Sequence, residues 1–282
     1  MISIKQNVDR FNQYEIDRRT ILIDSDGTRD IDKINKFIKD NNKVLLSVTY
    51  KSCDIICEIL NDLENVLIIF DEFHNFSYNN IYNEEDSINK LINNEKHNKL
   101  YLSATPRIYE LENNDDIDVN DIFGNYIYKM SFNEAINEKY ISDYEVYLPI
   151  FELKENEEIK SLNIHNDYLQ KIQFLIEGIK MCGNLKIIVY VRDHKEITNF
   201  IENFNKLNEY YQYDVNISSI TCNESYKKRD KILDDFNKSE KISILLSNHI
   251  LDEAIDIRSC NSIYMTYISS SKIKNIQRAR RS

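Results

Sequence analysis

The sequence predicts an α/β protein built from two consecutive sets of parallel strands and helices. Short runs rich in isoleucine, leucine and valine recur along the 282 residues, and between them lie longer stretches whose apolar residues are three and four positions apart. Continuous apolar runs fit strands that are covered on both faces, and the three-and-four spacing fits half-buried helices. A polar, acidic stretch separates the elements into two groups. Strands and helices in alternation predict parallel sheets with helices on their faces.

The first group of elements ends near Thr105. A helix is expected over Asp30–Lys39, because the large apolar residues of this stretch fall on one face. Cys53 and Cys57 are one helical turn apart and are expected on a second helix. The strands of this group are expected at Thr20–Ile23, Lys43–Val48, Val66–Phe70 and Lys99–Ser103.

A connecting region follows the first group. The stretch from Glu110 to Asp121 is polar and acidic and predicts a surface loop, and Ser131 to Glu138 predicts a short helix. We expect the domain boundary near Pro149, within about ten residues. The two domains are therefore expected over residues 1–147 and 148–282.

The second group repeats the rhythm of the first. Helices are expected over Asn166–Met181 and His194–Leu207, because each carries an apolar face with helical spacing. The strands of this group are expected at Glu145–Phe151, Lys186–Val191, Ile217–Thr221, Ile242–Ser247 and Ser262–Tyr267.

The charge balance limits the kinds of partner that the chain can bind. The formal net charge is -11 and the pI is about 5.1. Proteins that bind nucleic acid through a broad basic surface are normally basic. Any contact with nucleic acid is therefore expected to be local, through a few lysine, arginine and backbone amide groups.

The cysteines and the apolar runs bear on the cellular compartment. The five cysteines are scattered, and no second close pair completes a zinc site, which favours buried, reduced thiols. No apolar stretch approaches the length of a membrane span, and the first residues lack the apolar core of a signal peptide. We expect a soluble, intracellular protein without a membrane partner.

Two adjacent carboxylates follow one of the predicted strands. Asp71-Glu72-Phe73-His74 comes directly after the apolar run Val66–Phe70. Many nucleotide hydrolases present a magnesium-binding aspartate and a water-activating glutamate in this way. Taken alone, the tetrad is equally well interpreted as an acidic turn after a strand.

Small hydroxyl residues follow the next strand. Ser103-Ala104-Thr105 comes directly after Leu100-Tyr101-Leu102. Ligands of open α/β sheets bind at the carboxyl ends of the strands, where these hydroxyl groups would be able to bond to His74. The alternative is an ordinary strand-to-loop turn, because serine, threonine and proline favour loops.

In this order the two motifs resemble motifs II and III of superfamily 2 helicases and translocases. The similarity extends over most of the chain, and within that group the sequence looks most like helicase-like proteins of large DNA viruses with AT-rich genomes. The further segments that resemble family motifs are Ile2–Gln6 (motif Ia), Val48–Ser52 (motif Ib), Ile188–Arg192 (motif IV), Glu253–Ile257 (motif V) and Ile276–Arg281 (motif VI).

The resemblance implies two tandem RecA-like domains that use ATP and Mg²⁺ and act on DNA or RNA through its backbone. It implies that Asp71 binds the metal and that Glu72 is the general base, with His74 beside them. The resemblance implies that the motif III residues Ser103, Ala104 and Thr105 couple the state of ATP to the grip on nucleic acid. It implies that the nucleotide cleft is lined by Asp256, Gln277 and Arg278, and that Arg281 is the arginine finger. It also implies contacts with nucleic-acid phosphates at Thr49, Lys51 and Arg192.

The phosphate-binding loop of the family is missing from these residues. That loop needs Gly-x-x-x-x-Gly-Lys-Ser/Thr, but none of the four glycines precedes a lysine and no two have the required spacing. In the family the loop lies upstream of motif Ia, so the first domain is expected to be incomplete at its N-terminal end. Motif VI is also short, and Arg280 and Ala254 stand where the family has glycine.

Three origins remain open for such a chain: a fragmentary gene, half of a split motor completed by a second chain that supplies the phosphate loop, or a degenerate homologue kept for binding. Without the loop, ATP hydrolysis by the isolated chain is expected to be weak or absent. The leading hypothesis is an ATP-dependent helicase or translocase module. The alternatives are a non-enzymatic remnant that binds nucleic acid or protein, and a metal-dependent nuclease, for which the other acidic residues show no ligand spacing.

Overall fold

The computed structural model describes the chain as two compact units, Ser3–Tyr140 (unit 1) and Ile141–Ser282 (unit 2). The residues described are 8–9, 11–14, 18–25, 27–103, 109–110, 116–117, 122–147, 152–183, 185–248, 250–251, 257, 259–269, 275 and 278. The sequence predicts that residues 141–147 belong to the first domain. This assignment stays a prediction. No helix in the described part of the chain is long and apolar enough to cross a membrane.

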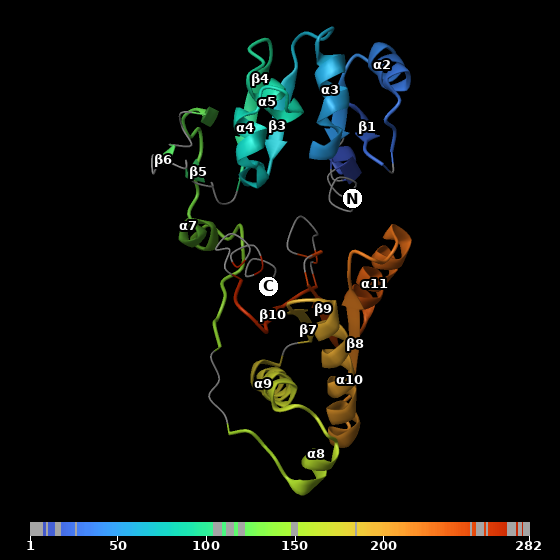
Figure 1. Ribbon diagram of the computed structural model, residues 1–282, viewed down its shortest axis with the longest axis vertical. Helices are drawn as coiled ribbons and strands as arrows, with labels where there is room; N and C mark the ends of the chain where they lie inside the picture. Colours follow the sequence, from blue (N-terminus) through green and yellow to red (C-terminus); the bar gives the residue numbers. More distant parts are fainter. Residues whose placement is uncertain are drawn as a thin grey trace. The chain divides into compact units, whose positions relative to one another are not determined.

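In the described part of unit 1, four short parallel strands form two hydrogen-bonded pairs. β1 (Arg19–Ile23) pairs with β2 (Val44–Val48), and β3 (Leu67–Asp71) pairs with β4 (Asn98–Leu102). The helices between them are α2 (Ile31–Lys39), α3 (Cys53–Leu60), α4 (Tyr78–Tyr82) and α5 (Ser87–Ile92), with 3-10 turns η1 (Tyr50–Ser52) and η2 (Phe73–Asn75) (Figure 1).

The helices of unit 1 pack against both strand pairs. The apolar faces of α3 and α5 form one buried cluster with Ile23 at the end of β1 and Phe70 in β3. On the other face of the sheet, Leu67 and Ile69 of β3 remain 55% and 46% exposed. Strands that are buried in parallel sheets are normally covered on both faces. The described part of unit 1 therefore covers one face of β3 and leaves the other open.

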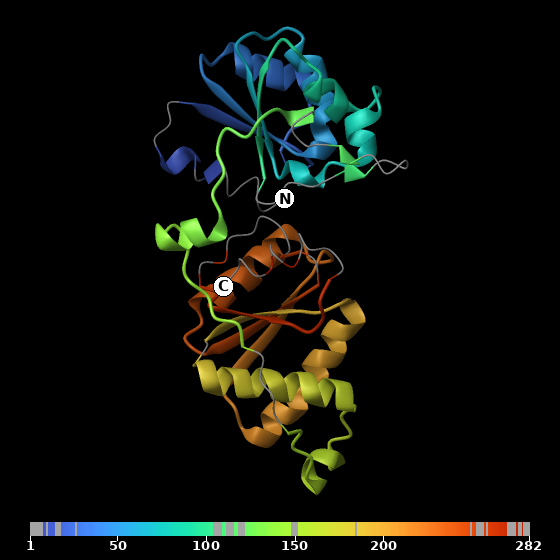
Figure 2. The same ribbon diagram turned by 90° about the vertical axis from the view of Figure 1, so that its left-hand side faces the viewer.

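The described residues of unit 2 form a parallel sheet with helices on both faces. The strand order is β10-β7-β9-β8, and every pair is parallel. α9 and α10 pack on one face and α11 on the other, as Figure 2 shows for unit 2. The elements are α8 (Glu157–Ser161), α9 (Asn166–Cys182), β7 (Lys186–Tyr190), α10 (His194–Tyr211), β8 (Val215–Ile220), α11 (Tyr226–Lys238), β9 (Ile242–Ser247) and β10 (Ser262–Met265).

The predicted α/β class is confirmed, and most predicted elements are present within a few residues of their expected limits. The short helix expected near Ser131 is α7 (Phe132–Asn137). The expected loop over Glu110–Asp121 differs, because β5 (Tyr109–Glu110) and β6 (Asp116–Ile117) form a short antiparallel ladder at this point.

The strand predicted over Glu145–Phe151 is wrong for its described residues, 145–147, which form no strand. Val146 and Tyr147 are 72% and 49% exposed. Strand propensity is realised only when a segment finds a partner strand and an apolar surface to cover. Residues 148–151 of that prediction lie outside the described residues.

Candidate functional site at the carboxyl ends of strands β3 and β4

The parallel register of β3 and β4 brings the two predicted motifs together. Asp71, the last residue of β3, lies opposite Leu102, the last residue of β4. Glu72 and Ser103 follow these residues directly, so both motifs lie at the same edge of the sheet. Ala104 and Thr105 lie outside the described residues.

The backbone turns sharply at Glu72. Its φ and ψ are 54° and 42°, which is the left-handed conformation, and η2 begins at the next residue. A side chain in this conformation costs about 1–2 kcal/mol relative to the right-handed region. The aromatic packing around the turn holds it in place, because the Phe73 ring lies 4.7 Å from that of Phe123 and 5.8 Å from that of Tyr101.

The turn places His74 between two oxygen atoms. His74 is buried, and its Nδ1 lies 2.9 Å from Ser103 Oγ and 3.1 Å from Glu72 Oε2. Glu72 Oε2 is itself buried and accepts no hydrogen bond within the described part of the chain. A neutral imidazole nitrogen either donates or accepts, so the tautomer of His74 decides which oxygen it bonds. The predicted contact between His74 and the serine of the second motif is therefore present.

Asp71 lies beside this cluster. Partial burial, together with the negative charge of Glu72, raises the pKa of the Asp71 carboxyl above its usual range. The hydroxyl of Tyr50 donates a 2.5 Å hydrogen bond to the backbone carbonyl of Asp71. Burial raises the pKa of this hydroxyl, so Tyr50 stays a neutral donor. This bond ties the segment after β2 to the end of β3.

The segment after β2 carries two of the predicted nucleic-acid contacts. Lys51 is exposed, and Thr49 Oγ1 donates to Ser52 Oγ at 3.2 Å. Arg29 also reaches this segment, with Nη1 3.4 Å from Ser52 Oγ and Nη2 3.4 Å from Asp54 Oδ2. The sequence reading missed Arg29. Its position, as a positively charged residue soon after the end of the strand at Ile23, is the sequence feature that would have identified Arg29.

Arg29 depends on a tight turn after β1. Gly27 donates its backbone N–H to Asp24 Oδ1 at 2.6 Å, and a Cβ at Gly27 would lie 2.4 Å from the carbonyl oxygen of Leu22. A glycine is therefore required for this close approach of backbone to backbone.

In unit 2, Arg192 follows β7 and is exposed. Its backbone N–H donates to Glu196 Oε2 at 2.7 Å, and Glu196 Oε1 accepts from Lys171 Nζ at 2.7 Å. Glu196 is buried and was also missed from the sequence, although Asp193-x-x-Glu196 has the spacing of a capping box. Glu196 thus fixes the loop that carries Arg192.

Arg278 is fully buried within unit 2. Its guanidinium lies over the rings of Tyr190 and Tyr267, at 4.7 and 5.1 Å from their centroids. Nη2 donates to the carbonyl of Asn248 at 3.2 Å and to the Tyr267 hydroxyl at 3.0 Å. Through its bond to Asn248, Arg278 is tied to the segment after β9. Its predicted role in a nucleotide cleft stays a prediction.

Like Ala104 and Thr105, the predicted site residues Asp256, Gln277 and Arg281 lie outside the described part of the chain. The same is true of motif Ia, at Ile2–Gln6. Among the described residues, no group of three or more histidine, cysteine, aspartate or glutamate side chains forms a metal-binding cluster.

Two family models match the chain. The Type III restriction enzyme, res subunit model matches residues 3–108, and the Helicase conserved C-terminal domain model matches residues 170–282. No curated relative matches it.

Solved structures with similar folds include two restriction enzymes. One is the ATP-dependent Type ISP restriction-modification enzyme LlaBIII bound to DNA, with TM-score 0.70 and 17% identity over 94% of this chain and 21% of that chain. The other is a fragment described as an HsdR subunit of a type I restriction enzyme from Vibrio vulnificus YJ016, with TM-score 0.58 and 17% identity over 97% of this chain and 48% of that chain. The chain thus spans a fifth to a half of the lengths of these two proteins.

These likenesses confirm the predicted fold of tandem RecA-like domains. The two domain models, matched in this order along one chain, support the predicted resemblance to the superfamily 2 helicases.

Proposed function

We propose that the chain is part of a nucleic-acid-dependent ATPase that works as a helicase or translocase. The observation that carries this proposal is the cluster of Glu72, His74 and Ser103 at the carboxyl ends of β3 and β4. A carboxylate, a histidine and a strand-end hydroxyl in contact are suited to linking water activation to a movement of the second strand.

The residues present fit a nucleotide-bound magnesium ion. Mg²⁺ is commonly held by one or two carboxylates, waters and substrate phosphates, so Asp71 suffices as its protein ligand and a larger cluster is not required. When bound, the ion would neutralise charge that develops on the phosphates. Glu72 would accept a proton from the attacking water at its other carboxylate oxygen, Oε1, while His74 orients the carboxylate through Oε2. We further propose that Ser103, Ala104 and Thr105 couple the state of ATP to the grip on nucleic acid.

Residues of unit 2 are also proposed to act on the nucleotide. We propose Asp256 and Gln277 for the cleft, Arg278 as the residue that positions the neighbouring segment, and Arg281 as the arginine finger that stabilises charge on the γ-phosphate. Thr49, Lys51 and Arg192 would contact the phosphate backbone of DNA or RNA. With a net charge of -11, these contacts are local rather than part of a broad basic surface.

The absence of Gly-x-x-x-x-Gly-Lys-Ser/Thr from these 282 residues favours impaired hydrolysis by the isolated chain. We propose that a further polypeptide segment, in this chain or a second one, supplies the phosphate loop. We also propose that, within this superfamily, the chain is most similar to the helicase-like proteins of large DNA viruses. The same absence favours the second candidate, a non-enzymatic remnant that binds nucleic acid or protein.

Binding and hydrolysis experiments separate the two candidates. Binding of single-stranded DNA and RNA oligonucleotides is measured by fluorescence anisotropy over a salt series. Lys51→Ala and Arg192→Ala are each expected to lower the slope of log K against log salt by about 0.7, because each removes one phosphate contact. Lys206→Ala, an exposed lysine on α10, is the matched control and leaves the slope unchanged.

Hydrolysis is then measured with and without oligonucleotide. The motor proposal expects weak ATPase activity that rises when a phosphate-loop segment is added and that Glu72→Gln abolishes. Binding without hydrolysis under all these conditions would support the remnant, and the absence of any binding to nucleic acid would count against the motor.

A further inference from the structure

Arg29 is a charged residue near the candidate site to which the proposed function gives no role. The parallel register of β1 and β2 pairs Ile23 with Val48, so the segments that follow these two strands leave the sheet at the same edge. Arg29 lies on the first of these segments, and Thr49 and Lys51 lie on the second. The fold thus brings Arg29 to the two residues of unit 1 that are proposed to contact nucleic-acid phosphates.

The contacts of the Arg29 guanidinium are long and leave most of its donors unused. Nη1 lies 3.4 Å from Ser52 Oγ, and Nη2 lies 3.4 Å from Asp54 Oδ2. Strong charge-assisted bonds between arginine and a carboxylate measure about 2.7–2.9 Å. A guanidinium has five N–H donors, and the remaining donors of Arg29 bond to nothing in the described part of the chain. Because the side chain is 49% exposed, these donors are accessible to a ligand from solvent.

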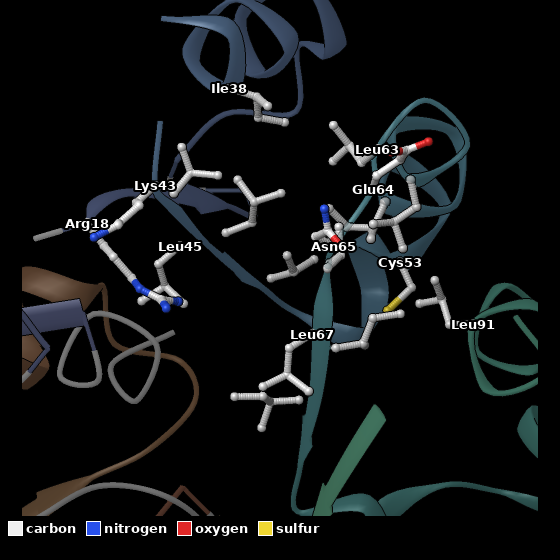
Figure 3. Close-up of a pocket in the computed structure, with 18 of the residues that line it drawn as sticks. Arg18, Ile38, Lys43, Leu45, Cys53, Leu63, Glu64, Asn65, Leu67 and Leu91 are labelled. Carbon is white, nitrogen blue, oxygen red and sulfur yellow. The ribbon is translucent and has the colours of Figure 1, made fainter. Parts of the chain in front are cut away.

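The ion pair between Arg29 and Asp54 contributes little to the fold. Asp54 is 60% exposed, and pairs of exposed charges add little to stability. Asp54 also lies away from the buried side of α3, where Cys53 and Ile56 line a cavity of about 570 Å³. Figure 3 shows Cys53 at the wall of this cavity. The pair is therefore free to break without disturbing the core.

The backbone on both sides of Arg29 is held more firmly than its guanidinium. Thr28 donates its N–H to the carbonyl of Leu22 at 3.0 Å, and the Thr28 hydroxyl accepts the N–H of Asp30 at 3.2 Å. Asp30 in turn caps α2 by accepting the N–H of Lys33. A fixed backbone with a weakly held head group lets a long side chain exchange one partner for another at little cost to the fold.

We propose that Arg29 binds a phosphate of the DNA or RNA backbone, and that Asp54 holds the guanidinium until this phosphate replaces it. This inference rests on the proposed function of the chain. The guanidinium presents two parallel N–H groups to a carboxylate and to a phosphate in the same way, so the two anions compete for one position. In the unbound chain the carboxylate of Asp54 offsets the charge of Arg29. Asp54 thereby lowers the affinity of the chain for nucleic acid.

The salt dependence of binding tests the role of Arg29 in the full chain. Binding of labelled single-stranded DNA and RNA is measured by fluorescence anisotropy. Arg29→Ala is expected to lower the slope of log K against log salt by about 0.7 and to weaken binding roughly fivefold in about 0.1 M salt, because one phosphate contact is lost. Lys90→Ala is the matched control, since Lys90 is also 49% exposed and lies 3.4 Å from Glu85 Oε2. It should change neither quantity.

Two conservative variants separate the charge of Arg29 from its packing. Arg29→Lys keeps the charge and should keep the slope, whereas Arg29→Gln keeps a polar side chain without the charge and should behave like Arg29→Ala. Thermal melts followed by circular dichroism should be the same for all of these variants, because the pair is exposed. A slope that Arg29→Gln leaves unchanged would overturn the proposed phosphate contact.

Asp54→Asn carries the opposite prediction. It should tighten binding about two- to fivefold, the range that one exposed ion pair contributes to an equilibrium, and leave the slope unchanged. Glu85→Gln is the matched control and should leave the affinity unchanged. In the Arg29→Ala background, Asp54→Asn should lose most of its effect. An equal gain in both backgrounds would show a general repulsion of phosphates and overturn the holding role of Asp54, as would weaker binding by Asp54→Asn.

The outcomes also separate this inference from the proposed function. If the wild type binds neither nucleic acid, both fail. If the wild type binds and Lys51→Ala lowers the slope while Arg29→Ala does not, the proposed function stands and Arg29 is not a phosphate contact.

Discussion

The left-handed turn at Glu72 should make this residue a net cost to stability. We expect Glu72→Gly to raise the free energy of unfolding of unit 1. A side chain at φ 54° costs about 1–2 kcal/mol, and glycine avoids that cost. Glycine also has more freedom in the unfolded chain, which offsets about 0.4–1 kcal/mol of the gain.

The carboxylate is not credited with a further gain. Glu72 Oε2 is buried, but His74 Nδ1 lies 3.1 Å from it, so Glu72→Gly removes this contact together with the buried oxygen. The net gain expected for Glu72→Gly is therefore about 0.5–1 kcal/mol, or roughly 1–5 °C in melting temperature for a unit of this size.

Urea unfolding followed by circular dichroism, with amide exchange to separate the two units, measures this gain. Glu72→Gln keeps the strained backbone and should change stability by less than about 0.5 kcal/mol. Lys139→Gly, at φ 62° in the same unit but away from the site, controls for relief of backbone strain alone. The reasoning is refuted if the urea midpoint of Glu72→Gly lies below that of the wild type. It is also refuted if this midpoint does not exceed that of Glu72→Gln.

Three further predictions concern the packing and the charges around the candidate site. Phe73→Ala should destabilise unit 1 by about 3–5 kcal/mol in urea unfolding, because it removes a buried ring from the aromatic cluster. The pKa of Asp71 is raised in the folded unit. At pH values just above the usual aspartate pKa near 3.8, the folded unit therefore binds more protons than the unfolded chain. The stability that Asp71 contributes falls as the pH rises through that window. Asp71→Asn should remove this decline when unfolding is measured from pH 3 to 7. Glu196→Ala should destabilise unit 2 by about 1–3 kcal/mol, because it removes the buried partner of Lys171, which keeps only the exposed Asp167 at 2.9 Å; an unchanged urea midpoint for unit 2 would contradict this.

The sequence was sufficient to predict that the acidic tetrad and Ser103 lie together. Both follow continuous apolar runs, and the carboxyl ends of parallel strands meet at one edge, so the order of elements alone implies the contact between His74 and Ser103. The same logic failed over residues 145–147, where a favourable composition found no partner strand among the described residues.

The contacts that the sequence could not predict depend on side chains that meet through loops. Tyr50 reaches Asp71, and Arg29 reaches Ser52, across connections whose course no local pattern determines. The left-handed backbone of Glu72 was also unforeseen, because glycine or asparagine is the residue that usually marks that conformation.

In the proposed function, the hydrogen bond made by His74 would change when Glu72 takes up a proton. With the proton on Nδ1, the ring donates either to Glu72 Oε2 at 3.1 Å or to Ser103 Oγ at 2.9 Å, but a single N–H bonds well to only one of them. In the proposed function, Glu72 is an anion before water attacks and holds that N–H as a charge-assisted acceptor. Once Glu72 has taken a proton its attraction weakens, and the N–H is left to Ser103. Because Ser103 is joined directly to the last residue of β4, one proton transfer at Glu72 would change a hydrogen bond on the second strand.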